Sequence, residues 1–161
     1  MHLKGLVDED FVNYKEPSLF LITSTCDWKC CREQNLPLSV CQNMPIIRDT
    51  TKDISEEKIY ERYIDNPITK SIVLGGLEPF DQFGEVYNLI YYFRVIKGNT
   101  DTFVIYTGYY PSEIDGMIKM LSMFDNIIIK FGRYIPNSKK IFDKILGVEL
   151  ASENQFALKI S

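Results

Sequence analysis

The hydrophobic pattern is dominated by four short apolar segments at residues 18–23, 70–74, 102–106 and 126–130. Each is nearly continuous in aliphatic, β-branched and aromatic side chains, and each is bounded by polar or small residues. Runs of this length and composition are typical of strands that are covered on both faces of a sheet. The pattern therefore predicts four buried strands.

Between these strands, apolar residues recur at helical spacing. Ser55 is the expected N-cap of a helix that continues to Tyr63 and has acidic residues in its first turn. A second helix is predicted over residues 81–97, and Pro111 and Ser112 open a third. Strands that alternate with helices form right-handed βαβ units, so we expect an α/β fold with a mostly parallel sheet.

The two ends of the chain have less regular patterns. Residues 1–17 end in a proline and are interpreted as an N-terminal arm with room for a short strand. In the tail we expect a helix at residues 139–145 and a last strand at either residues 147–150 or residues 155–159.

Composition narrows the class of protein. The chain has 161 residues, of which 45% are hydrophobic, and this suits a single domain over residues 1–161 with its own core. A net charge of −4 without a long basic run argues against nucleic-acid and membrane partners. No apolar run approaches the roughly 20 residues that cross a bilayer, and the acidic N-terminal residues lack a signal-peptide pattern. We therefore expect a cytoplasmic protein.

All four cysteines, Cys26, Cys30, Cys31 and Cys41, lie in the segment after the first predicted strand. In a reducing compartment such a group indicates metal ligands or catalytic thiols rather than disulfides. The single histidine, His2, disfavours His-containing zinc sites and His-based catalytic triads. From spacing alone three interpretations stay open: a three-cysteine 4Fe-4S cluster, a four-cysteine zinc site, and cysteines without a metal.

Two later strands run into glycine-containing turns. The second continues into Gly-Gly-Leu-Glu-Pro at residues 75–79, and the third ends at Thr107 and Gly108. Two glycines after a buried strand let a ligand approach the backbone, and Glu78 adds an acceptor for an ammonium group. An ordinary strand-to-helix turn is the structural alternative. Because the carboxyl ends of parallel strands share one edge of a sheet, these turns should lie beside the cysteine segment.

Taken together, these motifs resemble radical S-adenosylmethionine proteins, in particular the activating enzymes of anaerobic ribonucleotide reductase. The resemblance covers nearly all of residues 18–157. The segments that carry it are Cys26-x3-Cys30, the turn at 75–79, Tyr-Thr-Gly-Tyr at 106–109, the strand end at 128–134 and Ser-Glu-Asn-Gln at 152–155.

The resemblance implies a partial (β/α) barrel that binds a 4Fe-4S cluster and S-adenosylmethionine. In that family one electron cleaves S-adenosylmethionine to a 5'-deoxyadenosyl radical, which abstracts hydrogen from a substrate. The protein is then a radical S-adenosylmethionine oxidoreductase, and its expected partner is a glycyl-radical enzyme such as anaerobic ribonucleotide reductase. A one-electron donor such as flavodoxin or ferredoxin is the second expected partner. The alternatives are a non-catalytic zinc or iron–sulfur module of the same fold and a radical enzyme that acts on a small molecule.

The resemblance also assigns site residues. Cys26, Cys30 and Cys41 are the expected cluster ligands, within a cluster loop at residues 26–41. The expected cofactor-binding residues are Gly75, Gly76, Leu77, Glu78, Thr107, Gly108, Lys130 and Asn154. The family's third cysteine is normally separated from the second by two residues, a position that Glu33 occupies here. Cys41 takes the role if an insertion precedes it, and Cys31 is the rival third ligand.

Overall fold

Strands and short helical segments alternate along the chain in a computed structural model that describes residues 1–161. The strands are β1 (His2–Asp10), β2 (Ser18–Thr23), β3 (Lys52–Asp53), β4 (Ser71–Gly76), β5 (Thr102–Tyr106), β6 (Ile127–Phe131), β7 (Ile141–Asp143), β8 (Val148–Leu150) and β9 (Phe156–Lys159). The α-helices are α1 (Lys29–Glu33), α2 (Met44–Ile47), α3 (Glu56–Ile64), α4 (Phe83–Tyr91) and α5 (Asp115–Leu121). Shorter segments are the 3-10 turns η1 (Leu38–Val40), η2 (Pro79–Gln82) and η4 (Pro111–Glu113) and the π-helical turn η3 (Tyr92–Ile96).

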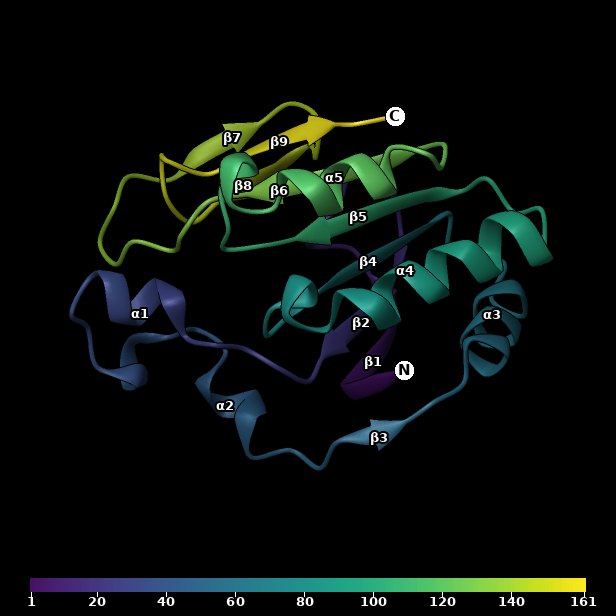
Figure 1. Cartoon of the computed structure of the whole chain (residues 1–161), viewed down its shortest axis with the longest axis horizontal. Helices are drawn as coiled ribbons and strands as arrows, with labels where there is room; N and C mark the ends of the chain where they lie inside the picture. Colours follow the sequence, from purple (N-terminus) through teal and green to yellow (C-terminus); the bar gives the residue numbers. More distant parts are fainter.

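Seven strands form one mixed sheet in the order β3-β1-β2-β4-β5-β6-β9 (Figure 1). The four predicted strands are present as β2, β4, β5 and β6, and they pair in parallel. The outer pairs β1–β2, β1–β3 and β6–β9 are antiparallel. The prediction of a partial (β/α) barrel with a mostly parallel sheet is therefore wrong, and the protein is a mixed α/β protein with few helices. The physical reason is that β1 and β9 join the sheet without a crossover helix, and parallel pairing requires such a crossover.

Both ends of the chain differ from their predictions. The expected N-terminal arm contains the nine-residue strand β1, which pairs with β2 from Leu3 opposite Thr23 to Asp10 opposite Ser18. The helix expected at residues 139–145 is wrong, because these residues form β7 and the turn of a hairpin with β8. Both alternative last strands exist, as β8 and β9.

The predicted helices are confirmed at their centres. Ser55 caps α3, where its Oγ accepts a hydrogen bond from the Lys58 backbone N–H at 3.4 Å. The helix expected over residues 81–97 is divided into η2, α4 and the π-helical turn η3. Gly98 follows with a φ of +66°, a left-handed conformation that favours glycine and ends the helix.

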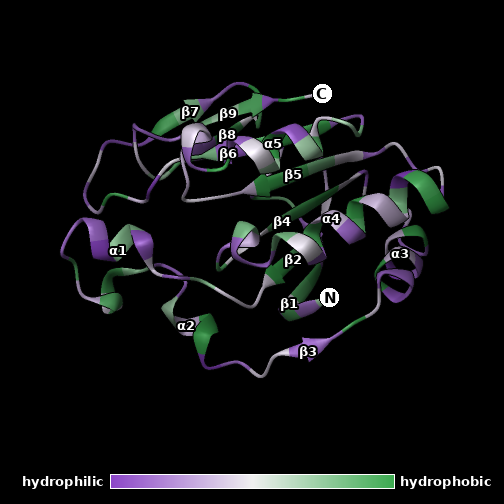
Figure 2. Ribbon diagram, in the orientation of Figure 1, coloured by the Kyte–Doolittle hydropathy of each residue, from purple (hydrophilic) through white to green (hydrophobic).

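The sheet has a core on each face. In β4, Ile72 and Leu74 pack with α3, α4 and α5, whereas Val73 between them packs with Leu146 and Leu150 on the opposite face. This is the two-residue alternation of a strand covered on both sides. Figure 2 shows the hydrophobic residues concentrated along β2, β4 and β5. None of the helices is both long and apolar enough to cross a membrane.

Candidate metal and ligand site

A cavity of about 430 Å³ lies beyond the carboxyl ends of the parallel strands. Figure 1 shows α1 and α2 on the side toward which β5 points, so the cysteine segment closes this end of the sheet. Residues of β8 and of the β1–β2 connection complete the wall. Volumes from about 300 Å³ upward are typical of pockets that bind small ligands.

The structure brings nearly all of the expected site residues to this cavity. Those that line it are Cys26, Cys30, Cys41, Gly75, Gly76, Leu77, Glu78, Thr107, Gly108 and Lys130. Asn154 is not among the lining residues. Its Nδ2 donates to the Tyr110 hydroxyl at 3.0 Å and to the Arg133 carbonyl at 2.9 Å, and its Oδ1 is buried without a partner.

The four cysteines are free thiols that differ in orientation and burial. Cys30 and Cys31 are neighbours on α1, where successive side chains point about 100° apart. Cys31 is only 6% exposed and Cys30 is half-buried, and both line the cavity. A Cβ added at Gly108 would lie 2.7 Å from the Cys30 Sγ, so this glycine leaves the space that the thiol occupies. Cys41, at the end of η1, approaches the cavity from a separate segment.

Burial favours the protonated form of two of the cavity thiols, Cys26 and Cys30. Burial raises the pKa of Cys26 to about 12, against the opposing effect of the Trp28 backbone N–H, which donates to its Sγ at 3.3 Å. Burial also raises the pKa of Cys30, and a hydrogen bond from the Tyr134 backbone opposes it. A metal that binds these sulfurs must displace their protons, and its binding free energy then contributes to stability.

The donor set fits an iron–sulfur cluster better than zinc. In a tetrahedral zinc site with Zn–S bonds near 2.3 Å, the sulfurs lie about 3.8 Å apart. No three cysteine sulfurs lie within 4.8 Å of one another, and the only trio of candidate ligand atoms that does is Cys26, Asp27 and Asp81. A cluster binds each thiolate through a different iron, which suits thiols from separate segments beside an open cavity.

The two glycines that end β4 lie close to strand β2. Gly76 has a φ of +89°, and a Cβ there would lie 2.5 Å from Ile22 Cγ2. A Cβ on Gly75 would lie 2.9 Å from Phe20 Cε2. The Gly76 carbonyl accepts a hydrogen bond from the Asn43 side chain. Sequence reasoning did not assign a role to Asn43, and its position two residues after Cys41 is the only local signal.

A buried acid, Glu78, and a buried base, Lys130, both line the cavity. Glu78 is 6% exposed and accepts hydrogen bonds from Thr107 Oγ1 at 2.7 Å, from the Gly108 N–H at 2.8 Å and from the Phe80 N–H at 3.1 Å. Burial nevertheless raises its pKa to about 7. Burial lowers the pKa of Lys130 to about 8, and the nearby Glu78 opposes this shift. The pair presents one acceptor and one cation to any ligand in the cavity.

The mixed sheet and its helices make this an α/β protein. The thiol-lined cavity at the carboxyl ends of its parallel strands is a candidate metal centre. The family model described as "4Fe-4S single cluster domain" matches residues 18–155, so the chain belongs to this family and an iron–sulfur cofactor is indicated. The match runs from the start of β2 to the residue before β9, and it includes all four cysteines. No curated protein and no solved structure matches the chain.

Proposed function

We propose that this 4Fe-4S domain binds S-adenosylmethionine in the cavity, cleaves it reductively and thereby activates a glycyl-radical enzyme. The observation that carries the proposal is that four thiols, a Gly-Gly turn and the buried side chains of Glu78 and Lys130 all line one cavity. When bound, the reduced cluster supplies one electron that splits S-adenosylmethionine into methionine and a 5'-deoxyadenosyl radical. A donor such as flavodoxin or ferredoxin supplies that electron.

The chain's own residues supply binding and orientation. Cys26, Cys30 and Cys41 are the proposed cluster ligands. An α-amino acid carries an ammonium and a carboxylate on one carbon, so one anionic and one cationic side chain in the same cavity suit it. The Glu78 carboxylate attracts the ammonium of the methionine group, and Lys130 attracts its carboxylate. Water is excluded from these contacts because both side chains are 6% exposed.

A protein substrate suits the cavity better than a second small molecule. A volume of about 430 Å³ is at the lower end of the range for ligand pockets, so the cofactors leave little room for another ligand. Val12, which is 74% exposed, stands at the wall of this cavity. The neighbouring Phe11 is 62% exposed, so two adjacent apolar side chains are exposed beside the cavity and suit contact with a partner protein.

Anaerobic reconstitution with iron and sulfide, followed by dithionite and S-adenosylmethionine, tests the proposal. We expect a cluster absorbance and the release of 5'-deoxyadenosine. Zinc at about one atom per chain after anaerobic purification, with no iron, would support the non-catalytic module instead.

Replacement of single cysteines tests the choice of the third ligand. Cys41→Ala should abolish the cluster, whereas Cys31→Ala should retain it, because Cys31 adjoins Cys30 on α1 and its side chain points about 100° away from that of Cys30. Iron and sulfide analysis of both variants measures the outcome. The reverse pattern would show that Cys31 is the ligand.

A further inference from the structure

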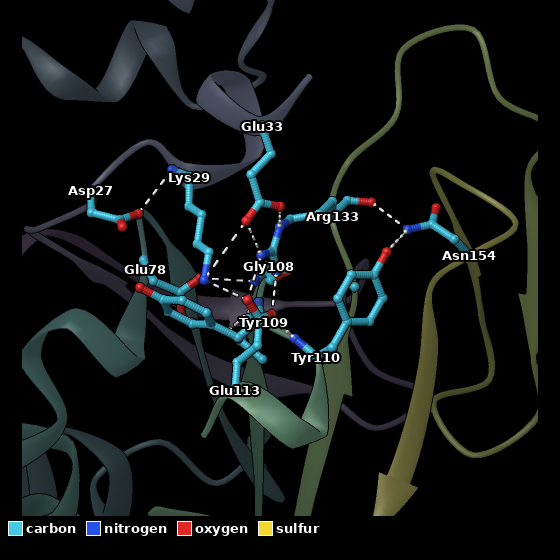
Figure 3. Close-up of polar contacts among 12 residues, drawn as sticks. Asp27, Lys29, Glu33, Glu78, Gly108, Tyr109, Tyr110, Glu113, Arg133 and Asn154 are labelled. Carbon is cyan, nitrogen blue, oxygen red and sulfur yellow. Dashed lines mark hydrogen bonds and ion pairs between the residues drawn. The ribbon is translucent and has the colours of Figure 1, made fainter. Parts of the chain in front are cut away.

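Arg133 is the centre of a charge network between helix α1 and the segment after β5 (Figure 3). Its side chain is 6% exposed. Nε and Nη2 donate to the two carboxylate oxygens of Glu33 at 2.9 and 3.0 Å, and Nη1 and Nη2 donate to those of Glu113 at 2.7 Å each. Nη1 also donates to the Gly108 carbonyl at 2.6 Å. All five N–H groups of the guanidinium are thereby used.

The two carboxylates come from different elements. Glu33 is the last residue of α1, and Glu113 is the last residue of η4. Lys29, the first residue of α1, also contacts Glu113 through its ammonium group. Figure 3 shows Glu33 and Glu113 on opposite sides of the Arg133 guanidinium. Both ends of α1 are therefore tied to one network that contains two cations and two anions.

The surroundings hold the guanidinium in one orientation. It lies over the rings of Tyr109 and Tyr110, at 5.7 and 5.1 Å from their centroids. The Asn154 side chain donates to the Arg133 carbonyl and to the Tyr110 hydroxyl, which fixes the backbone on the same side. A planar fork that pairs with two carboxylates and stacks on rings is a property of arginine that lysine lacks.

Helix α1 depends on such contacts. It has five residues and follows the left-handed residue Trp28, whose side chain makes no capping hydrogen bond; the Lys29 N–H donates instead to Asp27 Oδ1 at 2.8 Å. Helices this short are unstable without tertiary contacts. The network also reaches the cavity, because the Gly108 N–H donates to Glu78 while the Gly108 carbonyl accepts from Arg133.

We propose that Arg133 is a positioning residue that seats α1, and with it Cys30, against Gly108 at the wall of the cavity. The role of Cys30 as a cluster ligand rests on the proposed function, whereas the seating of α1 does not. The two can therefore be tested separately.

The first test uses the metal-free protein. Hydrogen exchange at residues 29–36 and alkylation of the buried Cys31 thiol, both followed by mass spectrometry, report whether α1 leaves its seat. In Arg133→Met both rates should rise about tenfold or more, because several charge-assisted hydrogen bonds that oppose local opening are lost. Arg133→Lys should restore part of the protection.

Two further variants make the result specific. Glu33→Gln removes one carboxylate whose side chain is 47% exposed, so the fold should persist while the same two rates rise. Arg62→Met breaks an exposed ion pair with Asp8, far along the chain, and should leave both rates unchanged. Unchanged rates in Arg133→Met and Glu33→Gln would overturn the proposal, as would a rise spread evenly over the strands in Glu33→Gln.

The second test follows reconstitution of the cluster. In Arg133→Lys the electron paramagnetic resonance spectrum of the reduced cluster should differ from that of the wild type, since a displaced Cys30 changes the ligand geometry. An identical spectrum at equal iron content would contradict the link from Arg133 to Cys30. If the wild type takes up no iron, the proposed function fails, while the metal-free experiment still decides the seating of α1.

Discussion

Glu78 is buried between donors that favour its ionised form, yet burial outweighs them. Its pKa is raised to about 7 in the folded protein from an ordinary value of 4.5. Between these two values the folded state holds a proton that the unfolded state has released. The stability that this proton gives is greatest at low pH and is lost as the pH rises through about 7.

This linkage predicts how Glu78→Gln changes the pH profile of stability. Between pH 5 and pH 7.5, the free energy of unfolding of the wild type should fall by about 2 kcal/mol relative to the variant. Urea unfolding of the metal-free proteins at both pH values measures the difference. A constant difference would show that Glu78 has an ordinary pKa in the folded state.

A second residue-scale prediction concerns Gly108. Its φ does not require glycine, but an added Cβ would lie 2.7 Å from the Cys30 Sγ. Gly108→Ala should therefore displace the thiol and reduce iron uptake several-fold while the fold is kept. Iron analysis after reconstitution and circular dichroism of the metal-free variant report the two effects.

Gly84→Ala is the matched control for this substitution. Gly84 is in α4 and has no atom within 4 Å of an added Cβ. Alanine there should stabilise the helix by about 0.5–1 kcal/mol and leave iron uptake unchanged. Equal iron uptake in Gly108→Ala and Gly84→Ala would contradict the packing of Cys30 against Gly108.

Among the elements, the β7–β8 hairpin is the one for which the sequence pattern wrongly predicted a helix. Asp143, at the end of β7, makes its turn possible. One carboxylate oxygen accepts from the Ile145 and Leu146 N–H groups, and the other accepts from the Ala157 N–H of β9, each at 2.9 Å. One side chain therefore closes the hairpin and ties it to the edge of the main sheet.

Asp143→Ala should destabilise the protein by roughly 1–3 kcal/mol, because three backbone donors lose a charged acceptor. Thermal unfolding measures the cost, and hydrogen exchange at residues 141–150 should show that the hairpin opens first. In Asp115→Ala, an exposed ion pair with Lys119 is lost, and the cost should stay below about 0.5 kcal/mol. Equal costs for the two variants would exclude the proposed role of Asp143.

In the molecule as a whole, the proposed cluster ligands belong to parts of the chain that no strand pairing holds together. Cys26 follows β2, Cys30 is on α1, and Cys41 follows η1. The long connection between β2 and β3 has few regular elements of its own. A group that binds all three sulfurs would therefore tie this connection to the carboxyl edge of the sheet.

Loading with iron and sulfide should consequently raise the melting temperature, because the cluster binds the folded state and not the unfolded chain. Removal of the iron with a chelator should return the protein to its metal-free stability. Cys30→Ala serves as the control and should melt at one temperature under both conditions. If the melting temperature of the wild type is the same with and without iron, a cluster that joins these three segments is contradicted.

Local sequence is sufficient for the parts of the fold that depend on neighbours along the chain. Continuous apolar runs identify β2, β4, β5 and β6, since a strand buried on both faces must be apolar throughout. Ser55 marks the start of α3 because its hydroxyl accepts from a backbone N–H three residues later. The cysteines and the glycine turn are recognisable by residue type, and the parallel strands predict that they meet.

Tertiary structure decides what depends on distant partners. The polar strand β1 and the short strand β9 acquire their roles only by pairing with β2 and β6, and this pairing makes the sheet mixed rather than barrel-like. Arg133 and Glu33 are 100 residues apart in the chain, so no local pattern reveals their bidentate contact. Periodicity reports which face of an element is buried, but charge pairing and strand order are set by which elements meet in space.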